Sequence, residues 1–368
     1  MKILIVSKAL LISAYRERLN ELATLDNVQL SALSPKRFKG ETTRSQKHGK
    51  FAHHIHNLFF PNSYHLNFYP SFRRLVAEVK PDLVHIDDEP FNFVTYHASR
   101  ILSSLRIKHV FTTLQNIKKS YPPPFNSFEH FVLKHSDGAI ALSDCARDLL
   151  IDKVIKKLVE VIPYGVDVNV FCRKANTRLK NSLGLGEHFV VGYAGRLAKE
   201  KGMDTLVESL SALREKFRVL VVGEGPYKRH IMKEVRKRGM EKKFVFAGHV
   251  NSLEIPQYLN CMDCLIMPSL TTSRWREQFG RALIEAMACE IPVVGSGSGE
   301  IPNVLSDAGL IFNEGAALAL RDCIVKLIKN TELRTQLAQK GRMRVMNCYA
   351  SGLVVRSTSD FYARIMNR

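Results

Sequence analysis

The sequence lacks a hydrophobic run of the length that spans a membrane, and its seven cysteines form no framework of paired spacings. A membrane-spanning helix needs about 20 apolar residues in a row. Cys261 and Cys264 form a lone Cys-x-x-Cys with no second pair and no nearby histidine ligands, so we expect no bound metal. Lys8 interrupts the apolar start of the chain, which therefore favours a buried first strand over an export signal. We expect reduced cysteines and a cytoplasmic protein.

Two common nucleotide-binding motifs are also absent. No Gly-Lys-Ser/Thr stands at the spacing of a P-loop, and no Gly-x-Gly-x-x-Gly opens a helix after the first strand. The sequence thus excludes the P-loop nucleotidases and contains no dinucleotide fingerprint. We expect no cofactor.

Negative charge is scarce in this chain. It has 35 acidic residues against 54 basic ones, for a net charge of +19. Such an excess indicates anionic partners, and a basic solvated surface is the alternative explanation. Because no zinc finger, RNP-like aromatic motif or basic region with heptads is present, we expect no nucleic-acid partner.

In residues 42–77 the basic residues have no acidic neighbours, because this stretch contains no acidic residue. Histidines and aromatic residues alternate with basic ones there, a composition that suits membrane headgroups, a lipid pyrophosphate or single-stranded nucleic acid. An ordinary basic surface is the alternative. We expect a peripheral contact with the inner face of an anionic membrane through five residues: Arg44, Lys47, Lys50, Arg73 and Arg74.

Short apolar runs alternate with helical segments along almost the whole chain. Continuously apolar runs are typical of parallel strands covered by helices on both faces, so the fold class is α/β with two doubly wound sheets. The expected strands are residues 2–7, 28–34, 54–60, 82–87, 109–114 and 138–143, then 189–194, 218–222, 244–247, 264–268, 292–295 and 309–312. In the first half, the expected helices include residues 14–23, 68–80, 91–105 and 125–135.

The two series of strands predict two Rossmann-like domains. We assign residues 1–165 to an N-terminal domain, 166–349 to a C-terminal domain, and 350–368 to a helix that crosses back to the N-terminal domain. Ligands of open α/β sheets bind at the carboxyl ends of the strands. We therefore expect the ligand in a cleft between the two domains.

Residues 277–288 combine two carboxylates with the start of a helix. Glu277 and Glu285 stand eight residues apart, about two helical turns, and Phe279 and Gly280 follow the first of them. Both carboxylates can thus face one cleft together with the free N–H groups of the helix start. This suits a ligand with hydroxyls at both ends and an anion between them, as in a nucleotide-diphosphate sugar. Two solvated glutamates are the alternative.

A glycine turn with basic residues follows the first strand of the second series. Arg196 and Lys201 precede Gly202, which opens a helix. Glycine permits close backbone approach to an anion, and the helix start and the two bases supply donors and charge, so we interpret this loop as a diphosphate site. Gly223 permits close ligand approach at the next strand end, and the backbone at Val250 suits a flat base. A structural turn is the alternative at both positions.

Seven motifs occur in a defined order in the second half. They are Pro-Tyr-Gly-Val-Asp (163–167), Gly-Arg-Leu-x-x-Glu-Lys-Gly (195–202), Val-Gly-Glu-Gly-Pro (222–226), Phe-x-Gly-x-Val (246–250), Asp-x-Leu-x-x-Pro-Ser (263–269), Glu-x-Phe-Gly-x-x-x-x-Glu-Ala-Met-Ala (277–288) and Pro-Val-Val-Gly-Ser-x-Ser-Gly-Glu-Ile-Pro (292–302). The chain resembles the retaining glycosyltransferases of family 4, which have the GT-B fold, and in particular the bacterial polysaccharide and glycolipid enzymes.

The resemblance implies roles for the residues that match its motifs. Arg196 and Lys201 would hold the diphosphate, and Glu285 would contact the ribose. Glu277 would contact the transferred sugar near the reacting carbon, so that Glu277, Arg196 and Lys201 form the catalytic set. The donor site would further include three backbone or packing positions beside Gly223: Val250, Phe279 and Gly280.

The first half resembles the family less closely. The carboxylates Asp87, Asp88 and Glu89 end a strand and could orient acceptor hydroxyls, with a solvated acidic loop as the alternative. Gln115 and Asn116 follow the next strand, where many family members have a histidine. We take Asp87, Glu89, Gln115 and Asn116 as the acceptor-side candidates.

The expected reaction is metal-independent transfer of a sugar, with retention, from a nucleotide-diphosphate sugar to a hydroxyl of a saccharide or lipid-linked acceptor. The bases and the helix start would stabilise the charge of the departing diphosphate. In a front-face route this phosphate takes the acceptor proton, so no protein nucleophile is needed. A double-displacement route is the alternative; it would need a protein nucleophile, which the sequence does not clearly nominate. Cell-surface polysaccharide or glycolipid synthesis is the expected setting. A GT-B nucleotide-sugar epimerase and a non-catalytic binding protein for anionic polymers are the alternatives.

Overall fold

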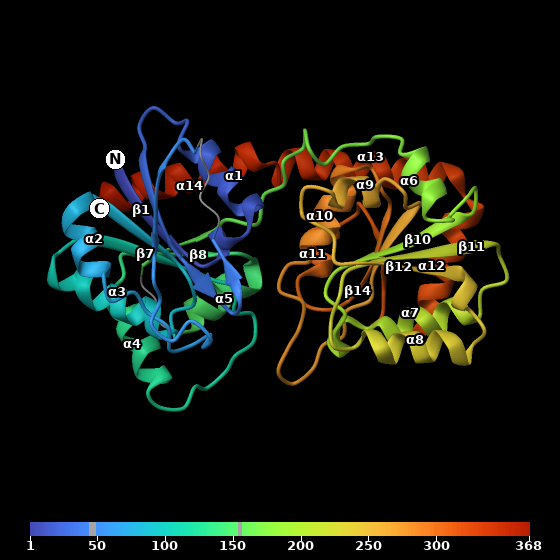
Figure 1. The fold of residues 1–368 in the computed structure, drawn as a ribbon, viewed down its shortest axis with the longest axis horizontal. Coiled ribbons are helices and arrows are strands. Elements are labelled where there is room, and N and C mark those ends of the chain that lie inside the picture. The colour runs from blue at the N-terminus through green and yellow to red at the C-terminus, as the bar shows by residue number, and fades with distance from the viewer. Residues whose placement is uncertain (44–48, 154–156) are drawn as a thin grey trace. The chain divides into compact units, whose positions relative to one another are not determined.

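The computed structural model describes residues 1–43, 49–153 and 157–368, which form two compact units (Figure 1). The first unit contains residues 1–163 and 352–368, and the second contains residues 164–351. Each unit is built on one parallel sheet with helices on both faces, which confirms the predicted fold class. Arg44 and Lys47 of the predicted membrane contact lie outside the described residues.

The first unit contains a seven-stranded sheet with the order β5-β2-β1-β6-β7-β8-β9. Helices α1 and α14 cover one face, and α2 and α3 cover the other (Figure 1). A short hairpin of β3 (Arg37–Phe38) and β4 (Glu41–Thr42) follows β2. The other elements are β1 (Lys2–Ser7), η1 (Ala9–Leu11), α1 (Ser13–Leu22), β2 (Gln29–Pro35), β5 (Ala52–His56), α2 (Phe72–Val79), β6 (Leu83–Asp87), α3 (Phe93–Ser104), β7 (Lys108–Thr113), α4 (Phe125–His135), β8 (Gly138–Ala141), α5 (Asp144–Asp152), β9 (Leu158–Val161) and α14 (Ser351–Met366).

The last helix is fixed to the first sheet by a buried polar contact. The Tyr362 hydroxyl lies 2.6 Å from Nδ1 of His85 on β6, and the Thr112 hydroxyl lies 2.6 Å from the other ring nitrogen. Burial lowers the pKa of His85 to about 4, so the imidazole is neutral near pH 7. Residues at the end of the chain thus belong to the core of the first unit.

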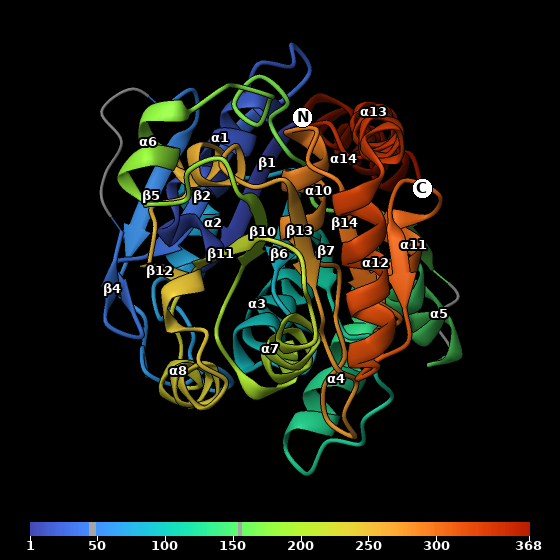
Figure 2. The same ribbon diagram turned by 90° about the vertical axis from the view of Figure 1, so that its right-hand side faces the viewer.

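The second unit contains a six-stranded sheet with the order β12-β11-β10-β13-β14-β15 (Figure 2). Helices α7, α8 and α12 pack on one face, and α9, α10, α11 and α13 on the other. The elements are α6 (Thr177–Ser182), β10 (Phe189–Ala194), η2 (Lys199–Lys201), α7 (Met203–Ser211), β11 (Phe217–Val222), α8 (Lys228–Lys237), η3 (Glu241–Lys243), β12 (Phe244–Gly248), α9 (Ile255–Leu259), β13 (Cys264–Met267), α10 (Arg281–Ala288), β14 (Val293–Ser296), α11 (Ile301–Leu305), β15 (Leu310–Phe312), α12 (Ala317–Lys329) and α13 (Thr331–Cys348).

The strand order creates one topological switch point in each sheet. In the first sheet, the chain continues from β1 to β2 on one side and from β6 to β7 on the other. Ser7 pairs with Asp87 where β1 and β6 end. In the second sheet, β10 and β13 occupy the same positions. Loops that diverge at such a point leave a crevice outside the carboxyl ends of the strands. Side chains from the loops after β10 and β13 are therefore brought together although they are distant in sequence.

Candidate functional site

The loop after β10 carries the basic residues at the switch point of the second sheet. Lys201 ends the short helix η2, and Gly202 (φ +68°) directly precedes α7. Arg196 is largely exposed, and its guanidinium lies 2.6 Å from the Glu200 carboxylate. The Tyr193 hydroxyl donates to the Arg196 carbonyl at 2.9 Å, which fixes the loop backbone. The loop thus has a backbone fixed at Arg196, and it places two cations, Arg196 and Lys201, at the carboxyl end of β10.

Lys201 and Glu277 form the centre of this site. The Lys201 ammonium lies 2.7 Å from one Glu277 carboxylate oxygen, and the Ser269 hydroxyl donates to the same oxygen at 2.7 Å. The Glu277 side chain is 8% exposed and that of Lys201 20%. Lys201 also lies over the indole ring of Trp275, 4.6 Å from the ring centroid. The structure therefore joins two of the three predicted catalytic residues in one ion pair with a hydroxyl and an aromatic face beside them, whereas the third, Arg196, is paired with Glu200.

The backbone of Glu277 is clamped by the loop after β14. Its carbonyl accepts from the Glu300 N–H at 3.1 Å, and a Cβ added at Gly299 would lie 2.0 Å from the same carbonyl oxygen. Gly280 adopts φ +83° before α10. The Phe279 ring is buried and contacts Tyr164 and Tyr349 edge-on at centroid distances of 5.5 and 5.7 Å. Packing on both sides of Glu277 thus fixes the backbone position from which its side chain extends.

Glu285 lies on α10 and is paired with a different cation. Its carboxylate lies 2.7 Å from Arg281, one turn earlier on the helix. Burial raises the pKa of Glu285, and the Arg281 guanidinium opposes this shift. Neither Glu277 nor Glu285 is thus a solvated end of an amphipathic helix, and the structure excludes that alternative for the pair.

Gly223 lies in a tightly packed turn beside the basic loop, and Val250 belongs to the core. The Gly223 N–H donates to the Gly248 carbonyl at 2.8 Å, and a Cβ at Gly223 would lie 2.0 Å from the Gly195 carbonyl oxygen. The Val250 side chain is buried in the core cluster that also contains residues of α10. Close approach of the Gly195 loop is therefore sufficient to explain why glycine occupies position 223.

The acidic residues of the first unit are held in a hydrogen-bonded network. Ser7 donates to Asp87 at 2.6 Å, and the Lys8 ammonium lies 2.6 Å from Asp88. Glu89 accepts from the Thr113 hydroxyl at 2.6 Å and from a backbone N–H at 2.8 Å. Because all three carboxylates have protein partners, this segment is not the solvated acidic loop of the alternative interpretation. Burial raises the pKa of Glu89 to about 7.

Gln115 and Asn116 follow β7 and are both buried. The Gln115 amide donates to the Ile117 carbonyl at 3.2 Å, and its oxygen accepts from Lys153 at 3.2 Å. Lys153 also forms a 2.6 Å ion pair with Glu129. The Thr113 hydroxyl, which donates to Glu89, also accepts from the Gln115 N–H at 3.1 Å. Glu89 and Gln115 thus belong to one network at the ends of neighbouring strands, and Asp87 is bound separately by Ser7.

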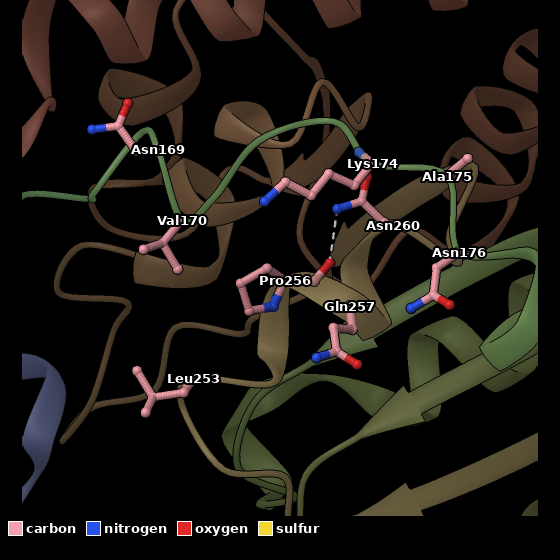
Figure 3. A pocket seen from close by; sticks show the side chains of 9 residues that line it. All are labelled: Asn169, Val170, Lys174, Ala175, Asn176, Leu253, Pro256, Gln257 and Asn260. Carbon is pink, nitrogen blue, oxygen red and sulfur yellow. Dashed lines mark hydrogen bonds between the residues drawn. The ribbon is translucent and has the colours of Figure 1, made fainter.

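A separate cavity of about 410 Å³ lies between α9 and the segment that leads into the second unit (Figure 3). Asn260 accepts from the Lys174 N–H at 2.8 Å and donates to the Cys172 and Pro256 carbonyls at 2.9 and 2.8 Å. These bonds fasten the segment to α9. None of the predicted donor-site residues lines this cavity, and we assign it no function.

Sequence reasoning did not single out Ser269 or Trp275 as site residues. Ser269 directly follows Pro268 in one of the quoted motifs, and this position was the signal that the sequence offered. Its complete burial is known only from the structure. Trp275 lies outside those motifs, and its position near Lys201 depends on the adjacency of β10 and β13. In the described ranges, no three His, Cys, Asp or Glu side chains gather as a metal-ligand set.

Comparison with known proteins places most of the chain in one group of enzymes. A family model described as Glycosyltransferase Family 4 matches residues 20–170, and one described as Glycosyl transferases group 1 matches residues 176–344. The chain belongs to the GT-B glycosyltransferases. The resemblance to the family is thereby confirmed, and it extends to the first half of the chain.

Several curated relatives of this glycosyltransferase are bacterial enzymes. N-acetyl-alpha-D-glucosaminyl L-malate synthase of Bacillus anthracis is 24% identical over 77% of this chain and 75% of its own length. The 2-deoxystreptamine glucosyltransferase of Streptomyces kanamyceticus is 29% identical over 56% of this chain, a match that spans only 52% of that enzyme. The solved structure of Anabaena Alr3699/HepE in complex with UDP has a TM-score of 0.81 at 18% identity and covers 99% of this chain and 100% of that one.

Proposed function

We propose that this glycosyltransferase moves a sugar, with retention of anomeric configuration, from a nucleotide-diphosphate sugar to a hydroxyl of a saccharide or lipid-linked acceptor in cell-surface polysaccharide or glycolipid synthesis. The observation that carries the proposal is the Lys201–Glu277–Ser269 cluster at the switch point of the second sheet. It combines a cation for a diphosphate with a carboxylate for sugar hydroxyls, and the buried Ser269 hydroxyl holds that carboxylate. The names of relatives support it, since they include a capsular polysaccharide glycosyltransferase and a GDP-mannose-dependent phosphatidylinositol monomannoside mannosyltransferase.

In the proposed reaction, the bond between the anomeric carbon and the β-phosphate oxygen breaks while the acceptor oxygen bonds to that carbon from the same face. The leaving diphosphate gains negative charge, which Lys201 and Arg196 stabilise, so the step does not depend on a metal ion. The departing phosphate oxygen takes the acceptor proton. Glu277 orients the transferred sugar, and Glu285 binds the ribose hydroxyls. Glu89 and Gln115, together with their neighbours Asp87 and Asn116, contact the acceptor.

Thermal unfolding with UDP, GDP, ADP and dTDP and their sugars tests this proposal. We expect one base to raise the melting temperature, equally with and without EDTA. A ligand at 100 times its Kd stabilises the folded state by about 2.7 kcal/mol, which corresponds to a shift of several degrees. Lys201→Met should reduce the shift for the diphosphate. The absence of any shift in the unsubstituted protein would contradict the proposal and favour a binding protein for anionic polymers.

Glu285→Ala should weaken binding of the nucleotide diphosphate by about 10- to 100-fold, because hydrogen bonds from ribose hydroxyls to a charged group are each worth about 1.5–3 kcal/mol. Calorimetric titration with the nucleotide that gives the thermal shift measures this change. The 2′-deoxynucleotide is the matched control, since it lacks one of the hydroxyls. The unsubstituted protein should discriminate between the two ligands and Glu285→Ala should not. Undiminished discrimination would assign the ribose contact to another residue.

We also propose that the first unit contacts an anionic membrane surface. Four large apolar side chains of the loop after β5 are exposed, namely Phe59 (52%), Phe60 (56%), Tyr64 (59%) and Leu66 (43%). Lys39 lies over the Tyr64 ring at 4.4 Å. Lys50, Arg73 and Arg74 are exposed within residues 42–77, which contain no acidic residue. Aromatic side chains with basic neighbours suit the headgroup region of anionic lipids. In the part of the chain that the structure describes, no helix is both long and apolar enough to span a membrane.

Sedimentation with lipid vesicles tests the membrane contact. The protein should bind phosphatidylglycerol vesicles, and the double substitution Phe59→Ser and Phe60→Ser should reduce binding by about tenfold or more, because each buried phenyl ring contributes about 1.5–3 kcal/mol. Leu318→Ser on α12 is the matched control, since Leu318 is 61% exposed in the second unit. Equal binding by both variants would contradict a role for this loop.

A further inference from the structure

Trp275 is the single tryptophan of the chain, and it lies in the segment between β13 and α10. A tight turn holds this segment, because Thr272 donates its N–H to the Trp275 carbonyl at 2.7 Å and accepts the Trp275 N–H on its hydroxyl at 2.9 Å. Thr271 donates its hydroxyl to Glu314 at 2.7 Å and so ties the segment to the loop after β15. These hydrogen bonds fix the backbone that carries the indole, so Trp275 does not lie in an unrestrained surface loop.

The indole face meets the same ammonium group that Glu277 binds. Lys201 Nζ lies 4.6 Å from the Trp275 ring centroid and 2.7 Å from the Glu277 carboxylate. An ammonium over an indole face gains about 0.5–2 kcal/mol, and the gain rises when water is excluded. A lysine side chain has four rotatable carbons and loses about 2 kcal/mol of rotamer entropy when it is fixed. The contact with Trp275 thus offsets a large part of the free-energy cost of ordering the Lys201 side chain.

Lys201 can keep both contacts while it binds a phosphate. An ammonium group has three N–H donors, and a single one of them is directed to Glu277 in the contact described above. The indole face takes no donor away from a ligand, because the attraction is electrostatic. A lysine that is already ordered loses less entropy on binding and therefore binds an incoming anion more tightly.

We propose that Trp275 is a positioning residue of the donor site: its indole face holds the Lys201 ammonium beside Glu277, ready for the diphosphate of a nucleotide sugar. The inference rests on the proposed function, because it assigns a role to Trp275 through the phosphate contact of Lys201. It also makes Trp275 an intrinsic reporter, since a diphosphate that binds Lys201 changes the charge next to the only indole ring.

Two substitutions separate positioning from simple packing. Trp275→Leu keeps an apolar side chain but removes the aromatic face, and we expect the Kd for UDP, or for whichever nucleotide diphosphate raises the melting temperature, to rise about 2- to 30-fold. Trp275→Phe keeps an aromatic face and should stay within about threefold of the unsubstituted protein. The corresponding nucleoside, which has no phosphate, should bind equally to all three proteins. Equal loss for nucleoside and diphosphate would overturn the proposal, because that pattern indicates disturbed packing.

A double-mutant cycle tests whether Trp275 acts through Lys201. In a Lys201→Met background, which removes the cation, Trp275→Leu should cause no further loss of diphosphate affinity. An undiminished effect of Trp275→Leu in that background would overturn the proposal. Melting temperatures of the unliganded variants verify that each is folded.

Tryptophan fluorescence gives a readout that a purely structural role would not change. Titration of the unsubstituted protein with the diphosphate should change the Trp275 emission, and the nucleoside should not; in Lys201→Met the response should vanish. If the diphosphate raises the melting temperature but leaves the emission and the Trp275→Leu affinity unchanged, the inference fails and the proposed function stands. If no nucleotide raises the melting temperature, both fail together.

Discussion

Glu277→Ala is expected to lower kcat by about 100-fold or more while nucleotide affinity stays within about threefold. The carboxylate is 8% exposed and is fixed by Lys201 and Ser269, so its position relative to a bound sugar is well defined. Removing a group that orients the reacting centre, and misplacing that centre by about 1 Å, each cost about 10²-fold in rate. The nucleotide itself should not bind more weakly, because Lys201 keeps its N–H donors for the diphosphate and stays over the Trp275 ring.

Steady-state kinetics and calorimetric titration of the same variant measure the two quantities separately. Glu234→Ala is the matched control, because Glu234 also forms a 2.6 Å ion pair, with Arg238 on the exposed side of α8. It should leave both quantities unchanged. Glu277→Gln keeps the shape of the side chain and should have an intermediate kcat. A loss of nucleotide affinity equal to the loss of kcat would mean that Glu277 serves the diphosphate and not the sugar.

Much of the fold could be predicted because parallel strands buried on both faces have a simple signature. The strand expected at residues 2–7 is β1, the one at 189–194 is β10, and the helix at 125–135 is α4. In β1 and β10 nearly every side chain is buried, so an uninterrupted apolar run is enough to locate them.

The predictions failed where apolar residues do not belong to a strand or where neighbouring signals compete. A strand was expected at residues 54–60, but β5 ends at His56, and Phe59 and Phe60 are exposed in the loop beyond it. The helix expected from residue 68 begins at Phe72, because Pro70 disfavours helical backbone in the residue before it. The strand expected through residue 143 ends at Ala141, since the Ser143 hydroxyl caps α5.

The candidate site was predicted residue by residue but not as an arrangement. Motif spacing identified Lys201 and Glu277 separately, whereas their 2.7 Å contact joins residues 76 positions apart. That contact exists because β13 is hydrogen-bonded to β10, an order of strands that the linear sequence does not state. For the same reason, sequence reasoning could not place Trp275 over Lys201.

Gly202→Ala is expected to destabilise the second unit by about 2–5 kcal/mol. Gly202 has φ +68°, a conformation that costs a residue with a Cβ about 1–2 kcal/mol. A Cβ there would also lie 1.8 Å from the Pro268 carbonyl oxygen, a backbone atom that cannot move aside as a side chain can. Overpacking of this kind adds about 1–3 kcal/mol. The Glu200 carbonyl accepts from the Leu270 N–H at 2.8 Å, so the clash also pushes apart the two loops that carry Lys201 and Glu277.

Urea unfolding followed by circular dichroism measures this loss, and Gly184→Ala supplies the matched control. Gly184 has nearly the same backbone conformation, φ +65°, but no atom lies within 4 Å of the added Cβ. Its substitution should therefore cost only the backbone term of about 1–2 kcal/mol. The difference between the two variants isolates the contact with Pro268. If both lose the same stability, the loops do not approach each other as closely as the structure has them, and the glycine of the Glu-Lys-Gly motif is then required by its backbone conformation alone.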